Sequence, residues 1–318
     1  MTLESAGHRL AEVAEGLVEL DKPLAGLTTY RLGGPASLYI EPAGEDDLVA
    51  LGAALAEAGS GSETPVLVLG RGSNVVISDE GFPGVVIRMG PAFQFIEETS
   101  DTGLKAGAST PLPMLANWAA RRNLSGLEFA VGIPGSVGGA VRMNAGAHEG
   151  DFASTLIAAR VYDLDSLELR DVQKDELGLT YRRSNLTDRQ LVCFARLELR
   201  AADPDEIRAR MDSFRRHRAT TQPGALQNAG STFKNPPGDS AGRLVEAAGL
   251  KGFRVGGVRV SELHANFFVA SDDATAQDVY DLVTEVGRRV EERFGVKLEP
   301  EVRFVGPFEV RAALGTDA

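Results

Sequence analysis

Apolar residues follow two spacings along this chain, and the spacing indicates which elements to expect. Leu3, Leu10, Val13, Leu17 and Leu20 recur at helical spacing, which predicts a helix over residues 3–20. Further helices are expected over residues 45–58, 111–123, 204–218 and 275–294. Strands are expected over residues 156–163, 167–172, 191–199, 264–271 and 298–305, and a hairpin from residues 93–98 and 104–109. The pattern predicts a chain of mixed helices and strands.

A glycine-rich stretch interrupts this pattern at residues 126–151, GLEFAVGIPGSVGGAVRMNAGAHEGD. Glycine lets backbone N–H groups approach a ligand closely, and Pro134 fixes the backbone just before Gly135. We expect a loop that runs into a helix N-terminus, where free N–H groups and the helix dipole favour an anion such as phosphate. A glycine-rich turn between two strands is the alternative.

A second loop of this kind lies within residues 65–89, PVLVLGRGSNVVISDEGFPGVVIRM. Residues 66–69 and 75–77 read as buried strands, and Gly70-Arg71-Gly72-Ser73-Asn74 lies between them. Such a loop offers backbone donors and a hydroxyl to a phosphate. It is neither a Walker loop, because Gly-Lys-Ser/Thr is absent, nor a dinucleotide fingerprint, because a strand follows it. Two anion loops fit a ligand with two linked phosphates, such as a dinucleotide cofactor. A valine side chain at Gly72 or Gly135 is expected to block the phosphate while the fold is largely kept.

Composition narrows the class of partner. The 318 residues favour about two domains, and the formal net charge of −12 argues against nucleic acid or an anionic membrane surface. The single cysteine, Cys193, lies in a strand-like run and is expected in the core, and the four histidines form no metal-binding motif. With no signal peptide and no apolar stretch of bilayer length, we expect a cytoplasmic protein.

Four groups of polar residues are candidates for chemistry. They are Arg182 in a polar loop, Ser231 with Lys234 and Asn235, His264 and Asn266 at the start of a predicted strand, and Glu299 with Glu301 on one face of the last strand. Each group has a structural alternative: a surface cation, a turn hydroxyl, a half-buried histidine or a strand ion pair. The residue types by themselves leave both interpretations open.

Eight ordered strings give the chain a specific resemblance. They are TTYRLGGPA, LGRGSNVVISDEGFPGVVIRM, GLEFAVGIPGSVGGAVRMNAGAHEGD, YRRSNL, NAGSTFKNP, SAGRLVEAAGLKG, SELHANFFV and LEPEVRFVG. Over roughly residues 25–306 the sequence resembles the UDP-N-acetylenolpyruvoylglucosamine reductase (UDP-N-acetylmuramate dehydrogenase, MurB) family. It resembles the branch that lacks a tyrosine-bearing insertion after the YR motif.

The resemblance implies an α+β fold of the vanillyl-alcohol-oxidase type (PCMH type). Two α+β subdomains would bind FAD and a C-terminal α+β domain would bind substrate, with an N-terminal helix at 1–20, FAD-binding subdomains at 21–89 and 90–203, and the substrate-binding domain at 204–318. It also implies a cytoplasmic enzyme of peptidoglycan precursor synthesis. NADPH would reduce non-covalently bound FAD, which would then reduce UDP-N-acetylglucosamine enolpyruvate to UDP-N-acetylmuramate.

The resemblance also assigns roles to residues of this chain. The catalytic arginine, serine acid and glutamate fall on Arg182, Ser231 and Glu301. The FAD contacts fall on Gly70, Arg71, Gly72, Ser73, Asn74, Val75, Gly132, Ile133, Pro134, Gly135, Ser136, Gly138, Gly139, Asn144 and Gly146. The substrate contacts fall on Tyr181, Arg182, Lys234, Asn235, His264 and Asn266, and no metal is implied.

Two rival functions remain open at this point. The first is another flavin enzyme of the same fold, such as an oxidase, although many of these tether FAD through a histidine or cysteine that residues 70–75 lack. The second is a non-catalytic nucleotide-binding protein, which would have no need of Arg182, Ser231 and Glu301 together. Consumption of NADPH that depends on the substrate separates all three functions.

Overall fold

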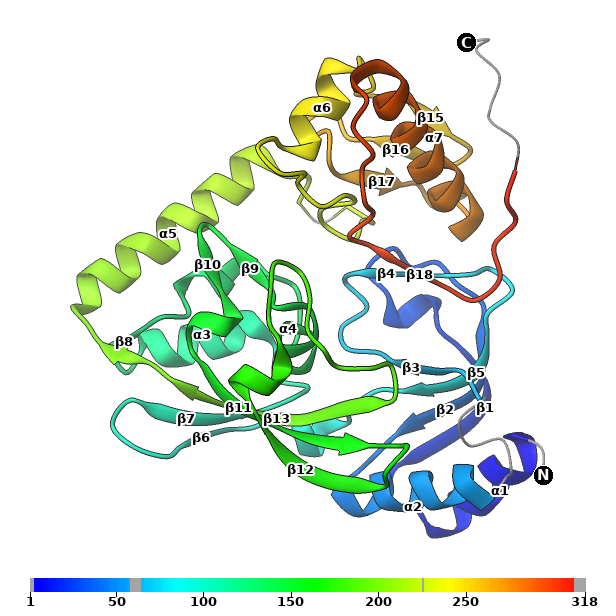
Figure 1. The fold of residues 1–318 in the computed structure, drawn as a ribbon, viewed down its shortest axis with the longest axis vertical. Coiled ribbons are helices and arrows are strands. Elements are labelled where there is room, and N and C mark those ends of the chain that lie inside the picture. The colour runs from blue at the N-terminus through cyan, green and yellow to red at the C-terminus, as the bar shows by residue number, and fades with distance from the viewer. Residues whose placement is uncertain (1–2, 58–63, 225, 312–318) are drawn as a thin grey trace. The chain divides into compact units, whose positions relative to one another are not determined.

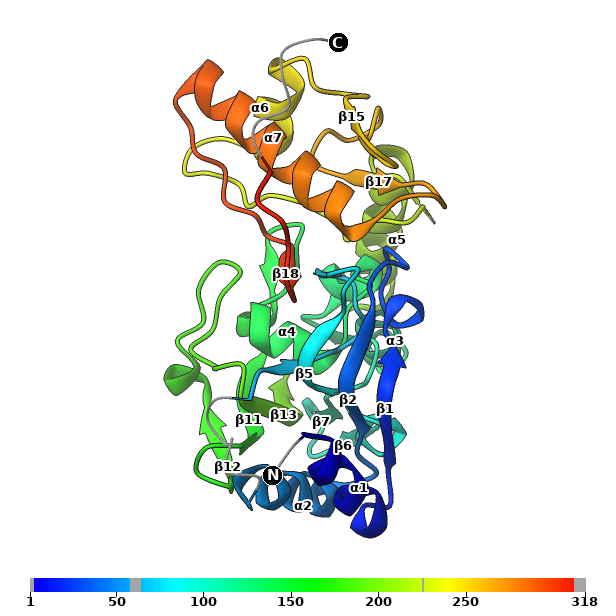
Figure 2. The same cartoon turned by 90° about the vertical axis from the view of Figure 1, so that its right-hand side faces the viewer.

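The chain forms two compact units, each made from segments that are separated in the sequence. The computed structural model describes residues 3–57, 64–224 and 226–311 (Figures 1 and 2). The first unit contains the N-terminal segment up to Lys22, Ala36–Arg71 and Pro83–Arg218; the second contains Pro23–Pro35, Gly72–Phe82 and the chain from Ala219 onward. Each unit has its own hydrophobic core. None of the helices in the described ranges is long and apolar enough to cross a membrane.

Two sheets form the framework of the first unit. One has the strand order β1-β2-β5-β3, with β3 parallel to β5, and the other is antiparallel with the order β12-β11-β13-β7-β6 (Figure 1). The strands are β1 (Leu17–Pro23), β2 (Pro35–Glu41), β3 (Val66–Val68), β5 (Phe82–Ile87), β6 (Ile96–Glu98), β7 (Gly103–Gly107), β11 (Leu156–Asp163), β12 (Glu168–Gln173) and β13 (Gln190–Glu198). Two short pairs are β8 (Leu124–Ser125) with β14 (Arg200–Ala201) and β9 (Gly146–Ala147) with β10 (Gly150–Asp151).

Helices cover these sheets and complete the first core. They are α1 (Leu3–Val13), α2 (Glu45–Glu57), α3 (Leu112–Ala120), α4 (Val137–Met143) and α5 (Pro204–Thr221). The short helix α4 packs on β13, and α3 packs on the 3₁₀ turn Glu128–Gly132. The core also contains Cys193, as expected, and burial raises the pKa of its thiol to about 12. The glycine-rich stretch is therefore fixed to a packed core at α4.

The second unit is built around the long helix α7 (Ala276–Phe294). Its buried stripe consists mainly of Val279, Leu282, Val283, Val286 and Val290, and full burial of each such side chain contributes ~1.5–3 kcal/mol. The helix contacts α6 (Ala241–Ala247) and the antiparallel sheet of β15 (Arg254–Val255), β16 (Val258–Val260) and β17 (Phe268–Ala270). A separate parallel pair joins β4 (Val75–Ile77) to β18 (Arg303–Val305). That pair places the strand after the Gly70 loop beside the last strand of the chain.

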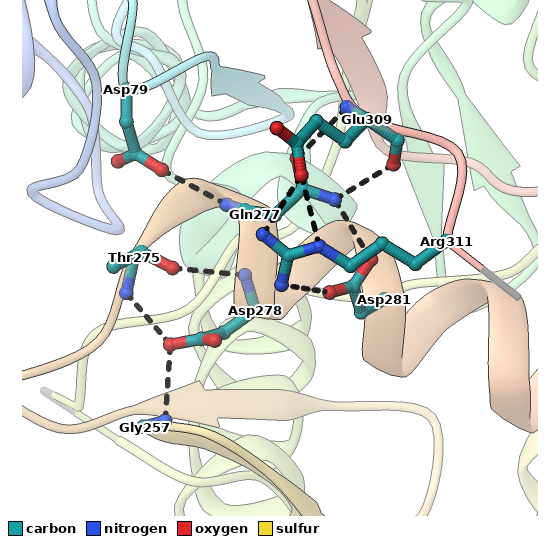
Figure 3. Close-up of polar contacts among 8 residues, drawn as sticks. All are labelled: Asp79, Gly257, Thr275, Gln277, Asp278, Asp281, Glu309 and Arg311. Atoms are coloured by element: carbon teal, nitrogen blue, oxygen red, sulfur yellow. Dashed lines mark hydrogen bonds and ion pairs between the residues drawn. The ribbon is translucent and has the colours of Figure 1, made fainter. Parts of the chain in front are cut away.

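Two side chains accept hydrogen bonds from the first N–H groups of α7: Thr275, just before the helix, and Asp79, from a distant segment (Figure 3). Thr275 accepts from the Asp278 N–H in a capping box, as the sequence pattern predicts. Asp79, which follows β4, accepts from the N–H groups of Ala276 and Gln277 at 2.9 and 3.1 Å. The first three N–H groups of the helix are therefore all paired, which helix termini require.

The segment after β18 returns to the same helix. The Gln277 side chain exchanges hydrogen bonds with the backbone N–H and C=O of Glu309, and Arg311 pairs with Asp281 at 3.1 Å (Figure 3). Tyr280 stacks on Phe308 with ring centroids 5.1 Å apart. These contacts fix the chain that follows β18 against α7.

Three of the expected elements are wrong. The helix expected over residues 3–20 ends at Val13, and residues 17–23 form β1 instead, because this segment pairs with β2 in the sheet. The strand expected from residue 264 begins only at Phe268, because side-chain hydrogen bonds hold residues 264–266 in a turn. The last strand begins at Arg303 rather than 298, and only an isolated bridge forms at Pro300, which has no N–H to donate.

We predict that Asp79→Ala lowers the free energy of unfolding by ~1 kcal/mol, because two N–H groups at the start of α7 lose a charged acceptor. Denaturant unfolding monitored by far-ultraviolet circular dichroism measures the change. The neighbouring exposed carboxylate gives the control variant, Glu80→Ala, which should change the stability by less than ~0.5 kcal/mol. Equal effects of the two substitutions would contradict a capping role for Asp79.

Candidate active site

The Gly70–Asn74 loop has the backbone geometry expected of an anion site. Among the described residues, no hydrogen bond uses the five consecutive N–H groups of residues 70–74. The loop is held from its carbonyl side, because the Gly72 carbonyl accepts from the Thr29 N–H at 3.0 Å. Five unpaired amides in one turn fit a phosphate group, which accepts several hydrogen bonds at once. No histidine or cysteine in this loop could tether a flavin.

Gly72 itself is required by the fold. Its φ is +62°, and a Cβ there would lie 2.1 Å from the Leu27 carbonyl oxygen. The expectation that a side chain at Gly72 blocks only the ligand is therefore wrong, because any side chain also displaces backbone.

The glycine-rich stretch runs from a 3₁₀ turn, Glu128–Gly132, through residues 133–136 into α4, as predicted. However, the first N–H groups of α4 are not free. The Val137 N–H donates to the Thr110 carbonyl and the Gly138 N–H to the Ala108 carbonyl, at 3.0 and 2.9 Å. The Ser136 side chain caps the Gly139 N–H. Free donors for an anion lie just before the helix instead, because within the described ranges the N–H groups of Gly135 and Ser136 have no acceptor.

The two glycine loops lie together at Gly70 and Ser136. A Cβ on Gly70 would lie 2.9 Å from the Ser136 Oγ, so the open amides of residues 70–71 and 135–136 belong to one place in the first unit. A cation lies beside the same loop, because a Cβ on Gly132 would lie 2.3 Å from Cδ of Arg218. Burial lowers the pKa of Arg218. Sequence reasoning missed Arg218; the only signal was the glycine that makes room for it.

Arg182 occupies a tight turn in the first unit. Thr180 and Arg183 exchange backbone hydrogen bonds across the turn, and Arg182 has a φ of +55°. Its Nη2 donates to the Gly146 carbonyl at 2.7 Å, and the guanidinium lies 4.9 Å from the centre of the exposed Tyr181 ring. A non-glycine residue at positive φ is strained and persists where the surroundings hold it.

Asn144 supplies much of that support. Its buried side chain donates to the Thr180 carbonyl at 3.1 Å and to Asp151, and accepts from the Ala153 N–H at 2.9 Å. Two residues expected to contact FAD, Asn144 and Gly146, therefore brace the Arg182 turn. Their contact with FAD remains a prediction.

A backbone ladder joins the Ser231 segment to the Glu301 segment in the second unit. The Thr232 carbonyl accepts from the Glu301 N–H at 2.8 Å, and the Lys234 N–H donates to the Glu299 carbonyl at 2.9 Å. Ser231 immediately precedes Thr232, which pairs with Glu301. The candidate acid and the candidate carboxylate therefore lie on adjacent backbone segments. Both residues are half-buried.

The amide of Asn266 holds this ladder from the other side. Its Oδ1 accepts from the Phe233 N–H at 2.9 Å and its Nδ2 donates to the Phe233 carbonyl at 2.8 Å. Its own backbone carbonyl accepts from the Thr232 N–H. Asn266 is 3% exposed, so these three bonds fix the Ser231 segment within the core.

The remaining candidates lie on the edges of the ladder. Lys234 forms an ion pair with the exposed Glu299, and the Asn235 side chain accepts from the Ala241 N–H at the start of α6 at 3.1 Å. His264 is half-buried, and its Nδ1 accepts from the Asn266 N–H at 3.2 Å. The structure thus groups Ser231, Glu301 and these residues in the second unit, whereas Arg182 and the Gly132–Ser136 loop belong to the first.

Comparison with known proteins identifies both parts of the chain. Residues 36–169 match the family described as an FAD binding domain, and residues 222–305 match the C-terminal domain of UDP-N-acetylenolpyruvoylglucosamine reductase. The UDP-N-acetylenolpyruvoylglucosamine reductase of Rubrobacter xylanophilus is 44% identical over 91% of this chain and 95% of its own length. That of Agathobacter rectalis is 43% identical over 92% of this chain and 95% of its own length.

A solved structure agrees with these relatives. The crystal structure of UDP-N-acetylenolpyruvylglucosamine reductase from Thermus caldophilus superposes with a TM-score of 0.77 at 39% identity, covering 92% of this chain and all of that one. The fold is therefore the α+β, PCMH-type FAD-binding fold followed by a C-terminal domain, as expected, and the cofactor is FAD.

We predict that Gly135→Val weakens FAD binding by ~10-fold or more, because its methyl groups obstruct donation from the open amides at 135 and 136. The folded protein should tolerate the change, since a Cβ there would make only ordinary contact with Leu112, at 3.5 Å. Flavin absorbance after gel filtration, together with fluorescence titration of the apoprotein, measures the loss. In the parent, acid should release intact FAD from the precipitated protein.

Gly44→Val is the matched control for this substitution. It lies in the same unit, and a Cβ at Gly44 would have no neighbour within 4 Å. It should bind FAD as the parent does. If Gly135→Val also binds FAD as the parent does, the glycine-rich stretch does not hold the pyrophosphate.

Proposed function

This chain belongs to the UDP-N-acetylenolpyruvoylglucosamine reductase family, and we propose that it uses NADPH to reduce the enolpyruvyl ether of UDP-N-acetylglucosamine enolpyruvate to UDP-N-acetylmuramate. The reaction supplies a precursor of peptidoglycan, and we place it in the cytoplasm. When bound, FAD would supply the hydride, taken from NADPH. In this proposal residues 21–89 and 90–203 hold the FAD and residues 204–318 hold the substrate.

The ladder between the Ser231 and Glu301 segments is the observation that carries the proposal. It places a hydroxyl and a carboxylate on adjacent, rigidly paired backbone. A nucleotide-binding protein without a reaction has no need of such a pair, since it does not transfer protons. The pair fits a reaction in which a proton must be delivered at a fixed position.

The reaction defines what these side chains do. Hydride addition at the terminal carbon of the enolpyruvyl group pushes an electron pair toward the carbon that bears the carboxylate. Arg182 offers a planar, permanently charged fork to that carboxylate and stabilises the developing charge. Ser231 then gives its hydroxyl proton to the basic carbon. In its protonated form, Glu301 would donate a hydrogen bond to the substrate carboxylate.

The other predicted contacts complete the proposed substrate site. Tyr181 precedes Arg182 in its turn, and Lys234 and Asn235 follow Ser231 along its segment. Asn266 bonds to Phe233 of the same segment, and its N–H donates to His264. Lys234 suits a phosphate of the UDP group, since its ammonium is a compact charge. Asn266 would contribute by positioning, because both ends of its amide already bond to Phe233.

The test of this function is oxidation of NADPH that requires the enolpyruvyl substrate. We expect loss of absorbance at 340 nm only when both are present, with formation of the lactyl ether. An oxidase of the same fold would consume oxygen without the enolpyruvyl substrate. A nucleotide-binding protein would consume neither, so the three candidate functions give different results.

Ser231→Ala separates the two halves of the reaction. Flavin reduction by NADPH requires no proton on carbon and should keep the parent rate within about threefold. Reoxidation of the flavin by the enolpyruvyl substrate should slow by ~10²–10⁴-fold, the range for a lost general acid. Stopped-flow absorbance follows each half.

Ser231→Cys provides the control for the same position. A thiol is a stronger acid of similar size, so this variant should recover part of the loss. Equal slowing of both halves in Ser231→Ala would mean that the residue positions ligands and does not donate the proton.

A further inference from the structure

The side chain of Asn74 reaches from the Gly70–Asn74 loop to the backbone of Glu301. Its Nδ2 donates to the Glu301 carbonyl at 3.0 Å. Its own carbonyl accepts from the Arg303 N–H, also at 3.0 Å. One residue thus makes hydrogen bonds to both sides of Val302, and the parallel pairing of β4 with β18 continues directly from it.

Glu301 is therefore held at both of its backbone polar groups. Its N–H donates to Thr232, in the Ser231 segment, and its carbonyl accepts from Asn74, in the anion loop. Pro300 cannot donate, so regular strand pairing starts only after this point. The hydrogen bond from the Asn74 side chain holds the Glu301 backbone in place of a strand hydrogen bond.

Asn74 thus connects the Gly70–Asn74 loop to Glu301. The N–H groups of residues 70–74 have no acceptor among the described residues, so this turn lacks internal hydrogen bonds at its amides. A bound phosphate would supply those acceptors and order the loop. Because Asn74 is the last residue of the loop, ordering it also orders the donor to the Glu301 carbonyl.

We propose that Asn74 is a positioning residue, which aligns Glu301 for reduction of the substrate and makes that alignment depend on FAD in the Gly70–Asn74 loop. The proposal rests on the proposed function, because it takes Glu301 as the group that meets the substrate. Asn74 acts through the Glu301 backbone and does not touch the reacting atoms. The substrate-dependent half of the reaction is therefore the half that Asn74 affects.

A double-mutant cycle tests this role in the holoenzyme at saturating FAD. Asn74→Ala removes the donor and should slow flavin reoxidation by the enolpyruvyl substrate by ~10-fold or more, since small misplacements of a catalytic group have large effects. Reduction of the flavin by NADPH should stay within about threefold of the parent. In a Glu301→Ala background, Asn74→Ala should cost less than about twofold, because the residue acts through Glu301.

Hydrogen exchange gives a readout that is independent of activity. FAD should slow amide exchange in a peptide covering residues 298–305 of the parent, and this protection should be reduced in Asn74→Ala. Asn74→Asp keeps the shape and replaces the donor by an acceptor facing the Glu301 carbonyl. It should reduce the protection at least as strongly as Asn74→Ala.

Asn117→Ala is the matched control. Asn117 also donates to a backbone carbonyl, that of Pro113, but within the first unit and on α3. It should leave both half-reactions and the exchange of residues 298–305 at the parent values, whatever its effect on the melting temperature.

The outcomes separate this proposal from the function on which it rests. A parent without substrate-dependent NADPH oxidation overturns the function, and the role of Asn74 with it. An active parent in which Asn74→Ala multiplies the Glu301→Ala defect, or slows both half-reactions equally, overturns the role of Asn74 alone. Unchanged exchange of residues 298–305 on FAD binding overturns the dependence on FAD.

Discussion

The hydrogen bond from the Glu301 N–H to the Thr232 carbonyl is the contact on which the proposed chemistry of the second unit depends. Both proposed catalytic side chains lie on irregular chain, where backbone is normally mobile. The bond, with the Lys234–Glu299 bond beside it, gives these segments strand-like rigidity without a full strand. Asn266 secures one side of the pair from the core, and Asp281 and Gln277 of α7 hold the chain that follows β18 (Figure 3).

The glycines of the two loops serve two different physical needs. Gly72 lies at a positive φ against the Leu27 carbonyl, so its role begins with the fold. Gly135 has room for a side chain, and its amide has no acceptor in the described part of the chain. An open amide at a place where the fold would accept a larger residue is what we expect of a ligand contact. The distinction is one of local geometry, which residue type by itself does not reveal.

Local signals in the sequence predicted local structure well. The strand Leu156–Asp163 and the capping box of Thr275 with Asp278 are confirmed, because both depend on neighbouring residues. Predictions failed where distant contacts decide. Residues 17–20 continue a helical pattern yet pair in a sheet. Residues 264–266 form a turn, and the Asn266 side chain there bonds to the distant Phe233 backbone. The α4 amides are taken by carbonyls of Ala108 and Thr110, which no spacing within residues 126–151 indicates.

The same reasoning applies to the candidate site. The resemblance assigned residues to chemistry, yet it could not separate side chains that meet a ligand from those that hold backbone. An amide buried at 3% exposure with both ends bonded, as in Asn266, gains no further partner without breaking one. The buried amide of Asn144 is bonded in the same way, beside Arg182. Arginine, serine and glutamate carry groups that can act on a substrate, whereas asparagine neither titrates nor carries charge. Around the proposed site its two-sided amide suits it to hold backbone donors and acceptors beside the residues that we propose to be reactive.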